Sequence, residues 1–433
     1  MKALTSLVAL LLTLLPVSAE IVINEIHYDP EPKTDLAEYV ELLNTGSEAI
    51  DLSGWQFTNG FDYTFPQGAT LEAGAYLILA QNFNGYQKKF GSIFVGGLKA
   101  FAGFDSGRLS NNGERIVLRN AAREIMDEVD YQVGFPWPTA SQGESIQANG
   151  DGVSMELLHP SLDNDLGGSW RAGTIPTPGK ENSVHTEPNL IPPHIRQVDH
   201  SPRAPRSGDP VIISAKVTDP DGVANVVLGY QHLEPGDYIR LTDDRYTTDW
   251  DDLIMVDDGS GPDETANDGI FSVAMPEALQ QHRHLIRYRI TVEDTAGNAL
   301  QAPYGDDPQP NFAYFVYDGV PAWKGAVDPG ETPEITFSAE TMNSIAVYHL
   351  IADNGDIEAQ QWGSSDRNWY GTVVYEDDIY DHMTFSKRGR ASRGQVGKEK
   401  WDWNFKRGHR FKGRNNYGER YDVDWREINV LPG

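Results

Sequence analysis

Hydrophobic residues alternate with polar ones over short runs along most of the chain, and Gly, Asn, Asp and Pro separate these runs. The clearest run predicts a strand over 285–292 whose apolar face consists of Ile286, Tyr288, Ile290 and Val292. Residues 401–405 alternate aromatic and polar positions in the same way. Helical periodicity is scarce, and the best helix candidate is a short one near 86–90. Such short alternating runs are typical of β-sandwiches, so we predict a mainly β protein.

Two proline-containing stretches divide the chain. Residues 174–193 include five prolines and no strand pattern, and a second stretch covers 306–310. Proline-rich linkers are extended and semi-rigid, and a chain of this length usually forms several domains. We therefore predict three units at about 20–186, 190–318 and 319–433.

The N-terminus has the features of a secretory signal. Lys2 precedes an apolar run over 4–15, and the small residues Val17, Ser18 and Ala19 follow it. We predict a signal peptide over 1–19 that is cleaved between Ala19 and Glu20. The apolar run is too short for a membrane-spanning helix, which needs about 20 residues. The mature protein is therefore expected to be secreted or at the cell surface, with no membrane span.

Composition narrows the classes of function. The chain has 433 residues, no cysteine, and 64 Asp plus Glu against 35 Lys plus Arg, which gives a net charge of -29. Without cysteine there is no disulfide scaffold, thiolate zinc site or cysteine nucleophile. The negative charge argues against nucleic-acid binding by the whole chain and against adsorption to an anionic membrane.

Positive charge is nevertheless concentrated in one segment. Residues 382–420 contain 12 Lys plus Arg and 3 acidic residues, a balance of +9, interleaved with aromatic residues. Such a segment can bind single-stranded nucleic acid. It can also bind an acidic polymer or the protein's own acidic domains, or form one lobe of a phosphate-binding site. A solvated strand face with no ligand is the alternative to all three.

Four polar residues of the first unit could form an acid–base site: Asn24, Glu25, Glu38 and Glu41. No nucleophile or metal cluster accompanies them. We therefore expect them to hold strand ends and turns by hydrogen bonding.

Several aspartates of the second unit are possible calcium ligands, because calcium prefers carboxylate oxygens. They are Asp219, Asp221, Asp257, Asp258, Asp263 and Asp268. Their spacing is not that of an EF-hand loop, and aspartate also favours turns for its own hydrogen-bonding reasons. Structural calcium and plain turn formation both stay open. We expect exposed loop positions and no metal for the histidines of this unit, namely His194, His200, His282 and His284.

The first unit begins with IVINEIHYDP over 21–30, followed by EYVELLNTGSEAIDLSGW over 38–55 and a turn and strand over 109–119. This order of segments resembles the bacterial lamin-tail domain, an immunoglobulin-like sandwich. The resemblance implies an interaction and spacer module of the kind found beside exported enzymes. The second unit resembles an immunoglobulin or fibronectin-type sandwich, which says little about activity.

The third unit contains YDHMTFSKRGRAS over 380–392, GKEKWDWNF over 397–405 and INVL over 428–431. This order resembles the N-terminal part of the CotH-type (spore-coat protein H-like) kinase family. The resemblance implies an incomplete α+β atypical kinase N-lobe that binds ATP and Mg²⁺. Arg388 and Lys398 would hold ATP phosphates and Ser392 would lie at the phosphate edge, with Lys400 a rival for Lys398.

By the same resemblance, the catalytic residues are expected beyond residue 433. We therefore predict a C-terminally truncated chain that is inactive as it stands, whereas the full-length form would transfer phosphate from ATP to protein hydroxyls. The alternative is a non-catalytic protein that binds an extracellular or cell-surface protein or a polysaccharide. An extracellular nucleic-acid binder is the third and least favoured function.

Overall fold

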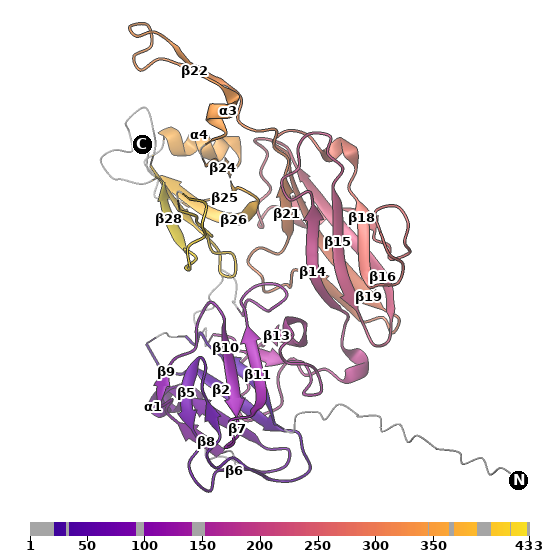
Figure 1. Ribbon diagram of the computed structural model, residues 1–433, viewed down its shortest axis with the longest axis vertical. Coiled ribbons are helices and arrows are strands. Elements are labelled where there is room, and N and C mark those ends of the chain that lie inside the picture. Colours follow the sequence, from indigo (N-terminus) through magenta and orange to yellow (C-terminus); the bar gives the residue numbers. More distant parts are fainter. Residues whose placement is uncertain are drawn as a thin grey trace, which may run out of the picture.

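The structure, a computed structural model, describes residues 21–31, 34–91, 99–140, 152–344, 346–362, 368–387, 400–415 and 417–430. These residues form three β units, which follow one another along the chain (Figure 1). The first unit lies at the bottom of Figure 1, the second at the right and the third at the upper left. The prediction of a mainly β protein is confirmed.

The first unit has two main sheets. The larger is β13-β12-β1-β2-β7-β8, made of Trp170–Ala172, Met155–Leu157, Ile21–His27, Tyr39–Asn44, Tyr76–Ala80 and Lys99–Ala102. Its pairs are antiparallel except β7 with β8. The second sheet is β11-β10-β4-β5-β9, made of Ile125–Tyr131, Glu114–Arg119, Gln56–Phe57, Phe61–Thr64 and Ser106–Gly107. A small pair joins β3 (Ile50–Asp51) to β6 (Thr70–Leu71).

One hydrophobic core joins the two sheets of this unit. Ile23 and Leu42 contribute to it from the larger sheet, and Phe57 and Ile116 from the second. The helix predicted near 86–90 is confirmed as α1 (Phe83–Phe90), which Asn82 caps by accepting the Gly85 N–H. Two 3-10 turns, η1 (Gly167–Ser169) and η2 (Pro188–Leu190), lie toward the second unit.

The second unit is also built from two sheets. The first is β14-β15-β18, made of His194–Ser201, Ile212–Thr218 and Ile270–Ala274. The second has the order β17-β16-β19-β20, and β21 also pairs with β19; these strands are Asp251–Ile254, Val223–Leu233, Leu285–Asp294, Ala299–Ala302 and Phe312–Phe315. Short helical turns are α2 (Arg245–Thr248) and η3 (Glu277–Leu279). The predicted apolar face of β19 is confirmed, because Ile286, Tyr288, Ile290 and Val292 are all buried in the core.

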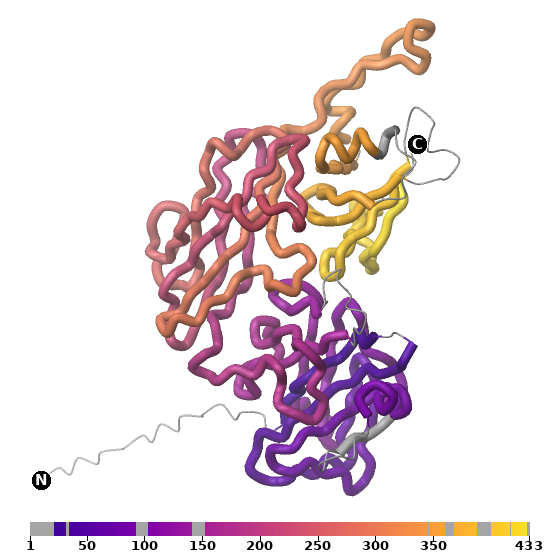
Figure 2. The backbone as a smooth tube through the Cα atoms, turned by 180° about the vertical axis from the view of Figure 1, so that it is seen from behind, coloured from indigo at the N-terminus to yellow at the C-terminus, as the bar shows by residue number. Residues whose placement is uncertain are grey.

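The third unit contains one antiparallel sheet in the order β24-β25-β26-β27-β28. Its strands are Tyr348–Ile351, Trp369–Tyr375, Asp378–Lys387, Trp401–Asn404 and Glu427–Val430. Helix α4 (Asn354–Trp362) lies between β24 and β25 in the chain, and α3 (Ala339–Met342) precedes β24. A hairpin of β22 (Trp323–Gly325) and β23 (Ile335–Phe337) projects away from the body of the molecule in both views (Figures 1 and 2).

Candidate functional site

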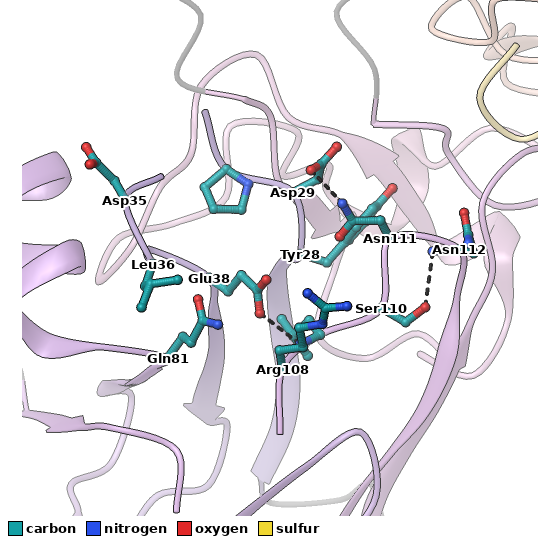
Figure 3. A pocket seen from close by; sticks show the side chains of 12 residues that line it. Tyr28, Asp29, Asp35, Leu36, Glu38, Gln81, Arg108, Ser110, Asn111 and Asn112 are labelled. Carbon is teal, nitrogen blue, oxygen red and sulfur yellow. Dashed lines mark hydrogen bonds between the residues drawn. The ribbon is translucent and has the colours of Figure 1, made fainter. Parts of the chain in front are cut away.

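A cavity of about 440 Å³ opens in the first unit, between the segment after β1 and the segment after β9 (Figure 3). Tyr28 and Asp29 contribute from the end of β1, Gln81 follows β7, and Arg108 to Asn112 follow β9. The view shows Glu38 and Arg108 facing the same space. The cavity is therefore lined by loops at one end of a rigid sandwich, a common position for binding sites.

Some polar groups of this cavity are already engaged. The Leu109 N–H donates to Glu38 Oε2 at 2.8 Å, and Asn111 Nδ2 donates to Asp29 Oδ1 at 2.8 Å. Burial raises the pKa of Glu38 to about 7, although the Leu109 N–H and the nearby Arg108 charge oppose that shift. A carboxyl of this kind can donate or accept a hydrogen bond near neutral pH.

Other polar groups of the cavity are uncommitted. Within the residues that the structure describes, the side chains of Gln81, Arg108 and Asn112 make no hydrogen bond or ion pair. The sequence predicts a structural role for Glu38 and points to none of these three residues. They are ordinary loop residues in the sequence, and only the approach of three separate loops brings them together.

A second cavity, of about 530 Å³, lies where the three units meet. The first unit contributes residues 132–137, the second Pro303, Asp307 and Phe312, and the third residues that include His409 and Arg410. Asn112 lines both cavities, so the two adjoin. Figure 2 shows the third unit lying beside the second and above the first, which is the arrangement that creates this junction.

The basic segment contacts acidic groups of the other two units. Arg407 forms an ion pair with Asp29 of the first unit, and its guanidinium lies 5.1 Å from the centre of the Tyr28 ring. His409 Nε2 lies 2.7 Å from Asp307 Oδ1 of the second unit. One interpretation of this segment, binding to the protein's own acidic domains, therefore holds for these two residues.

Further basic residues of the segment pair within the third unit. Arg414 Nε lies 2.6 Å from Glu376 Oε2, and Arg420 lies 3.1 Å from Asp424 Oδ1. These pairs reduce the positive charge available to a nucleic-acid backbone.

A buried ion pair joins the second and third units. Arg287 of β19 donates to Asp381 of β26 through Nε at 2.6 Å and Nη2 at 3.0 Å, and neither side chain is exposed to solvent. Burial alone would raise the pKa of Asp381, but the Arg287 charge outweighs burial and holds this pKa well below its usual value. Tyr238, Thr372 and Asn311 also donate hydrogen bonds to the Asp381 carboxylate. The local sequence around Asp381 gives no sign of this interface.

The first unit buries carboxyl groups without a cation. Glu156, Glu25 and Glu41 lie opposite one another on β12, β1 and β2. The Thr177 N–H donates to Glu25 at 2.9 Å, and the Gly179 N–H donates to Glu41. The expected structural role is confirmed for Glu25 and Glu41, because they hold the segment that follows β13.

The same segment had been predicted to be an extended linker. Asn182 is buried, and its side chain donates to Asn24 O at 3.0 Å and to Leu157 O at 2.8 Å. This part of the proline-rich stretch therefore packs onto the first sheet. Periodicity could not reveal it, because the contacts are single hydrogen bonds from a turn-rich segment.

The possible calcium ligands occupy two separate turns. Asp219 accepts the Asp221 N–H after β15. In the turn before β18, Asp257 accepts the N–H groups of Asp268 and Gly269, and Asp258 accepts that of Ser260. Across the described ranges, no group of three His, Cys, Asp or Glu side chains is placed to hold a metal ion. These hydrogen bonds are those of turn-forming aspartates, and calcium binding stays a prediction.

The residues predicted to hold ATP, Arg388, Ser392 and Lys398, lie outside the described residues. They fall between β26 and β27, which are neighbours in the third sheet. Lys400 immediately precedes β27 and is exposed. The kinase resemblance therefore stays a prediction.

The expectation of exposed loop histidines is wrong for three of the four residues. His194 lies in β14 and is partly buried. His200 lies in β14, is buried, and its Nδ1 is 3.1 Å from the Tyr288 hydroxyl. His284 is also buried, with Nδ1 2.7 Å from His232 Nε2. Both are core histidines with hydrogen-bond partners from other strands, which the local sequence does not reveal.

Comparison with known proteins identifies one domain. Residues 16–132 match the family model described as Lamin Tail Domain, so the first unit contains a lamin tail domain, as the sequence resemblance predicted. The match ends before β12 and β13, which complete the larger sheet. No curated protein matches the chain.

One solved structure that matches is described as a tetra-tandem repeat in the extending region of a large adhesion protein. It has 8% sequence identity, with 89% of this chain and 80% of that chain covered, and a TM-score of 0.18. No helix among the described residues has the length and apolar character needed to cross a membrane.

Proposed function

We propose that the chain is an exported binding protein whose first unit holds a polysaccharide in the cavity of Figure 3. The observation that supports this function is the uncommitted polar set of Gln81, Arg108 and Asn112 beside the Glu38 carboxyl. Together they supply amide and guanidinium donors and amide and carboxyl acceptors. A sugar hydroxyl both donates and accepts hydrogen bonds, so a sugar suits this mixed polar lining better than an apolar ligand does.

The test is calorimetric binding of the mature chain to a panel of neutral polysaccharides. The variant Gln81→Ala/Arg108→Ala is expected to weaken binding about tenfold or more, because two hydrogen-bonding groups are lost. Gln67→Ala, on an exposed turn of the same unit, is the matched control and should bind like the wild type. Unchanged binding by the double variant would overturn the assignment of the site. If the chain binds a surface protein and no polysaccharide, the ligand of this cavity is a protein.

Export is tested separately. The mature protein recovered outside the cell is expected to begin at Glu20, because the small residues before it form the predicted cleavage site. N-terminal sequencing measures this directly. An N-terminus at Met1 in protein retained by the cell would contradict export.

A second candidate function is that of a nucleotide-binding lobe in a CotH-like kinase that phosphorylates protein hydroxyls. The third unit favours it with a five-stranded antiparallel sheet in chain order. By the sequence resemblance, Arg388, Ser392 and Lys398 would hold ATP with Mg²⁺. Lys398→Ala should abolish binding of ATP with Mg²⁺, whereas Lys324→Ala on the projecting hairpin should not. No ATP binding by the wild type would eliminate this candidate.

A further inference from the structure

The cavity at the junction of the three units has a basic wall and two carboxylates, Asp307 and Asp424, and its other walls are uncharged. His409, Arg410, Lys412 and Arg420 all come from the connection between β27 and β28. His409 is paired with Asp307, and Arg420 with Asp424. Within the described part of the chain, neither Arg410 nor Lys412 has a carboxylate at ion-pairing distance. Two cations of this wall therefore form no ion pair within the described residues.

The surroundings of Arg410 reinforce this excess of positive charge. Its guanidinium donates to the Phe405 carbonyl at 2.8 Å, which does not neutralise it. Burial lowers the pKa of Arg410, and the charges of Arg426 and Arg407 lower it further, whereas the Asp29 charge opposes that shift. A bound anion would reverse this repulsion, because an opposite charge in a partly buried site is weakly screened.

The other walls have a different chemistry. Phe135, Pro136 and Trp137 of the first unit and Pro303 and Phe312 of the second form an apolar side. Gln132 and Asn112 add amide groups. The cavity thus offers apolar contact, amide hydrogen bonds and two cations that form no ion pair, within about 530 Å³.

We propose that the junction cavity binds an acidic sugar residue, a uronic acid within a glycan chain. The carboxylate pairs with Arg410 and Lys412, the C–H face of the ring packs against the apolar side, and the hydroxyls bond to the amides. A nucleic acid fits less well, because every nucleotide carries a charged phosphate, whereas a glycan chain needs only one uronic acid residue at the two cations here.

This inference does not depend on the proposed function, because Arg410 and Lys412 do not line the cavity of Figure 3. The shared residue Asn112 makes the two cavities neighbours, so a single glycan chain could run through both. The two ideas fail separately. Gln81→Ala/Arg108→Ala tests the first cavity with neutral glycans, and the variants below test the second with charged ones.

The experiment compares the mature chain's binding of an oligogalacturonate and of its fully methyl-esterified form. Esterification removes the charge and keeps the sugar ring. The acidic form is expected to bind about tenfold or more tightly, with an affinity that falls as salt rises. Arg410→Gln/Lys412→Gln should remove that difference. Arg414→Gln is the control, since Arg414 lies on the same connection but is paired with Glu376 and does not line the cavity.

The single variant Lys412→Gln is expected to fold normally even if the double variant does not, because no hydrogen bond within the described residues involves the Lys412 ammonium. It should weaken binding of the acidic form about fivefold or more while leaving the thermal transition unchanged. Equal binding of acid and ester, no binding of either, or a wild-type response in both variants would overturn the proposal. Tighter binding of an oligonucleotide of equal charge would overturn it in favour of a nucleic acid.

Discussion

Two regions of the molecule bury carboxyl groups completely, and they treat the charge in opposite ways. In the first unit, burial and the neighbouring Glu156 raise the pKa of Glu25 to about 7, and burial raises the pKa of Glu41 as well. At the interface of the second and third units, Arg287 holds the pKa of Asp381 well below its usual value. Both regions bury their carboxyl groups fully, so the presence of a neighbouring cation decides whether the pKa is raised or lowered.

The difference shows what each region contributes. The glutamates accept hydrogen bonds from a segment of their own unit and are easily protonated, so they hold a local structure. The Arg287–Asp381 pair joins strands of different units and has no solvent to replace a lost partner. Removing one charge should therefore cost much more at the interface than in the glutamate cluster.

The largest effect is expected for Asp381→Asn. It leaves the Arg287 charge buried without a counter-charge, which should lower the free energy of unfolding by about 3 to 5 kcal/mol. Urea unfolding at neutral pH measures it. The control Arg287→Met/Asp381→Leu removes both charges and should recover most of the loss. A cost below about 1 kcal/mol for the single variant would contradict a strong interface pair.

The next largest effect is a dependence of the stability of the first unit on pH. Because the pKa of Glu25 rises from 4.5 to about 7 on folding, the folded unit binds a proton that the unfolded chain releases. This proton stabilises the folded unit by up to about 3 kcal/mol. The stabilisation is complete below about pH 4.5 and is lost as the pH rises through about 7. Urea midpoints across this window measure the loss, and Glu25→Gln should reduce it, with Glu38 and Glu41 contributing the remainder. Stability that rises over the same window would contradict the assignment.

Asp381 sharpens this test, because its pKa shifts the other way. Its contribution is present above the usual aspartate pKa and is lost only as the pH falls into strong acid. The interface should therefore be insensitive to pH where the glutamate cluster is sensitive. The two transitions are separable if each unit is followed by its own probe.

A smaller effect is expected at the contact of the first and third units. The Arg407 and Asp29 side chains are 19% and 9% exposed, so water screens this pair more than it screens Arg287 and Asp381. Arg407→Gln should cost about 1 to 2 kcal/mol and increase hydrogen exchange around residues 28 and 407. Arg414→Gln, at a more exposed pair, is the control. Unchanged exchange would mean that the pair does not hold this contact.

The smallest effect is expected on the projecting hairpin. Lys324 and Glu334 form an ion pair whose side chains are 63% and 59% exposed. Lys324→Ala should change the free energy of unfolding by less than about 0.5 kcal/mol, because water and salt screen an exposed pair. The same urea experiment measures it. A cost above about 1 kcal/mol would contradict the expectation that the stabilisation by an ion pair increases with its burial.

Local elements were well predicted from the sequence. The alternation of Ile286, Tyr288, Ile290 and Val292 correctly indicated a strand with one buried face, because alternate side chains of a strand point to one side. The segments of the lamin tail domain were recognisable for the same reason, since their strands and turns are contiguous in the chain. The structural role of Glu25 and Glu41 followed from the lack of any catalytic partner nearby.

The candidate site was not predicted from the sequence. Glu38 was expected to be structural, and Gln81 and Arg108 were not named, because they come from other loops and have no unusual sequence context. The basic segment was evident as a composition. Which of its cations are neutralised depends on Asp29 and Asp307, which belong to other units.

The sequence by itself determined the strands, the turn-rich β class, the acidic net charge and the position of the basic segment, because each depends on residues close together in the chain. Only the tertiary structure decided which buried carboxyl has a cation and which cations are left free. Asp381 is 94 residues from Arg287, and no local pattern records that pairing. A carboxyl's charge depends on what lies within a few ångströms of it, and in this protein the fold brings those neighbours from distant strands and separate units.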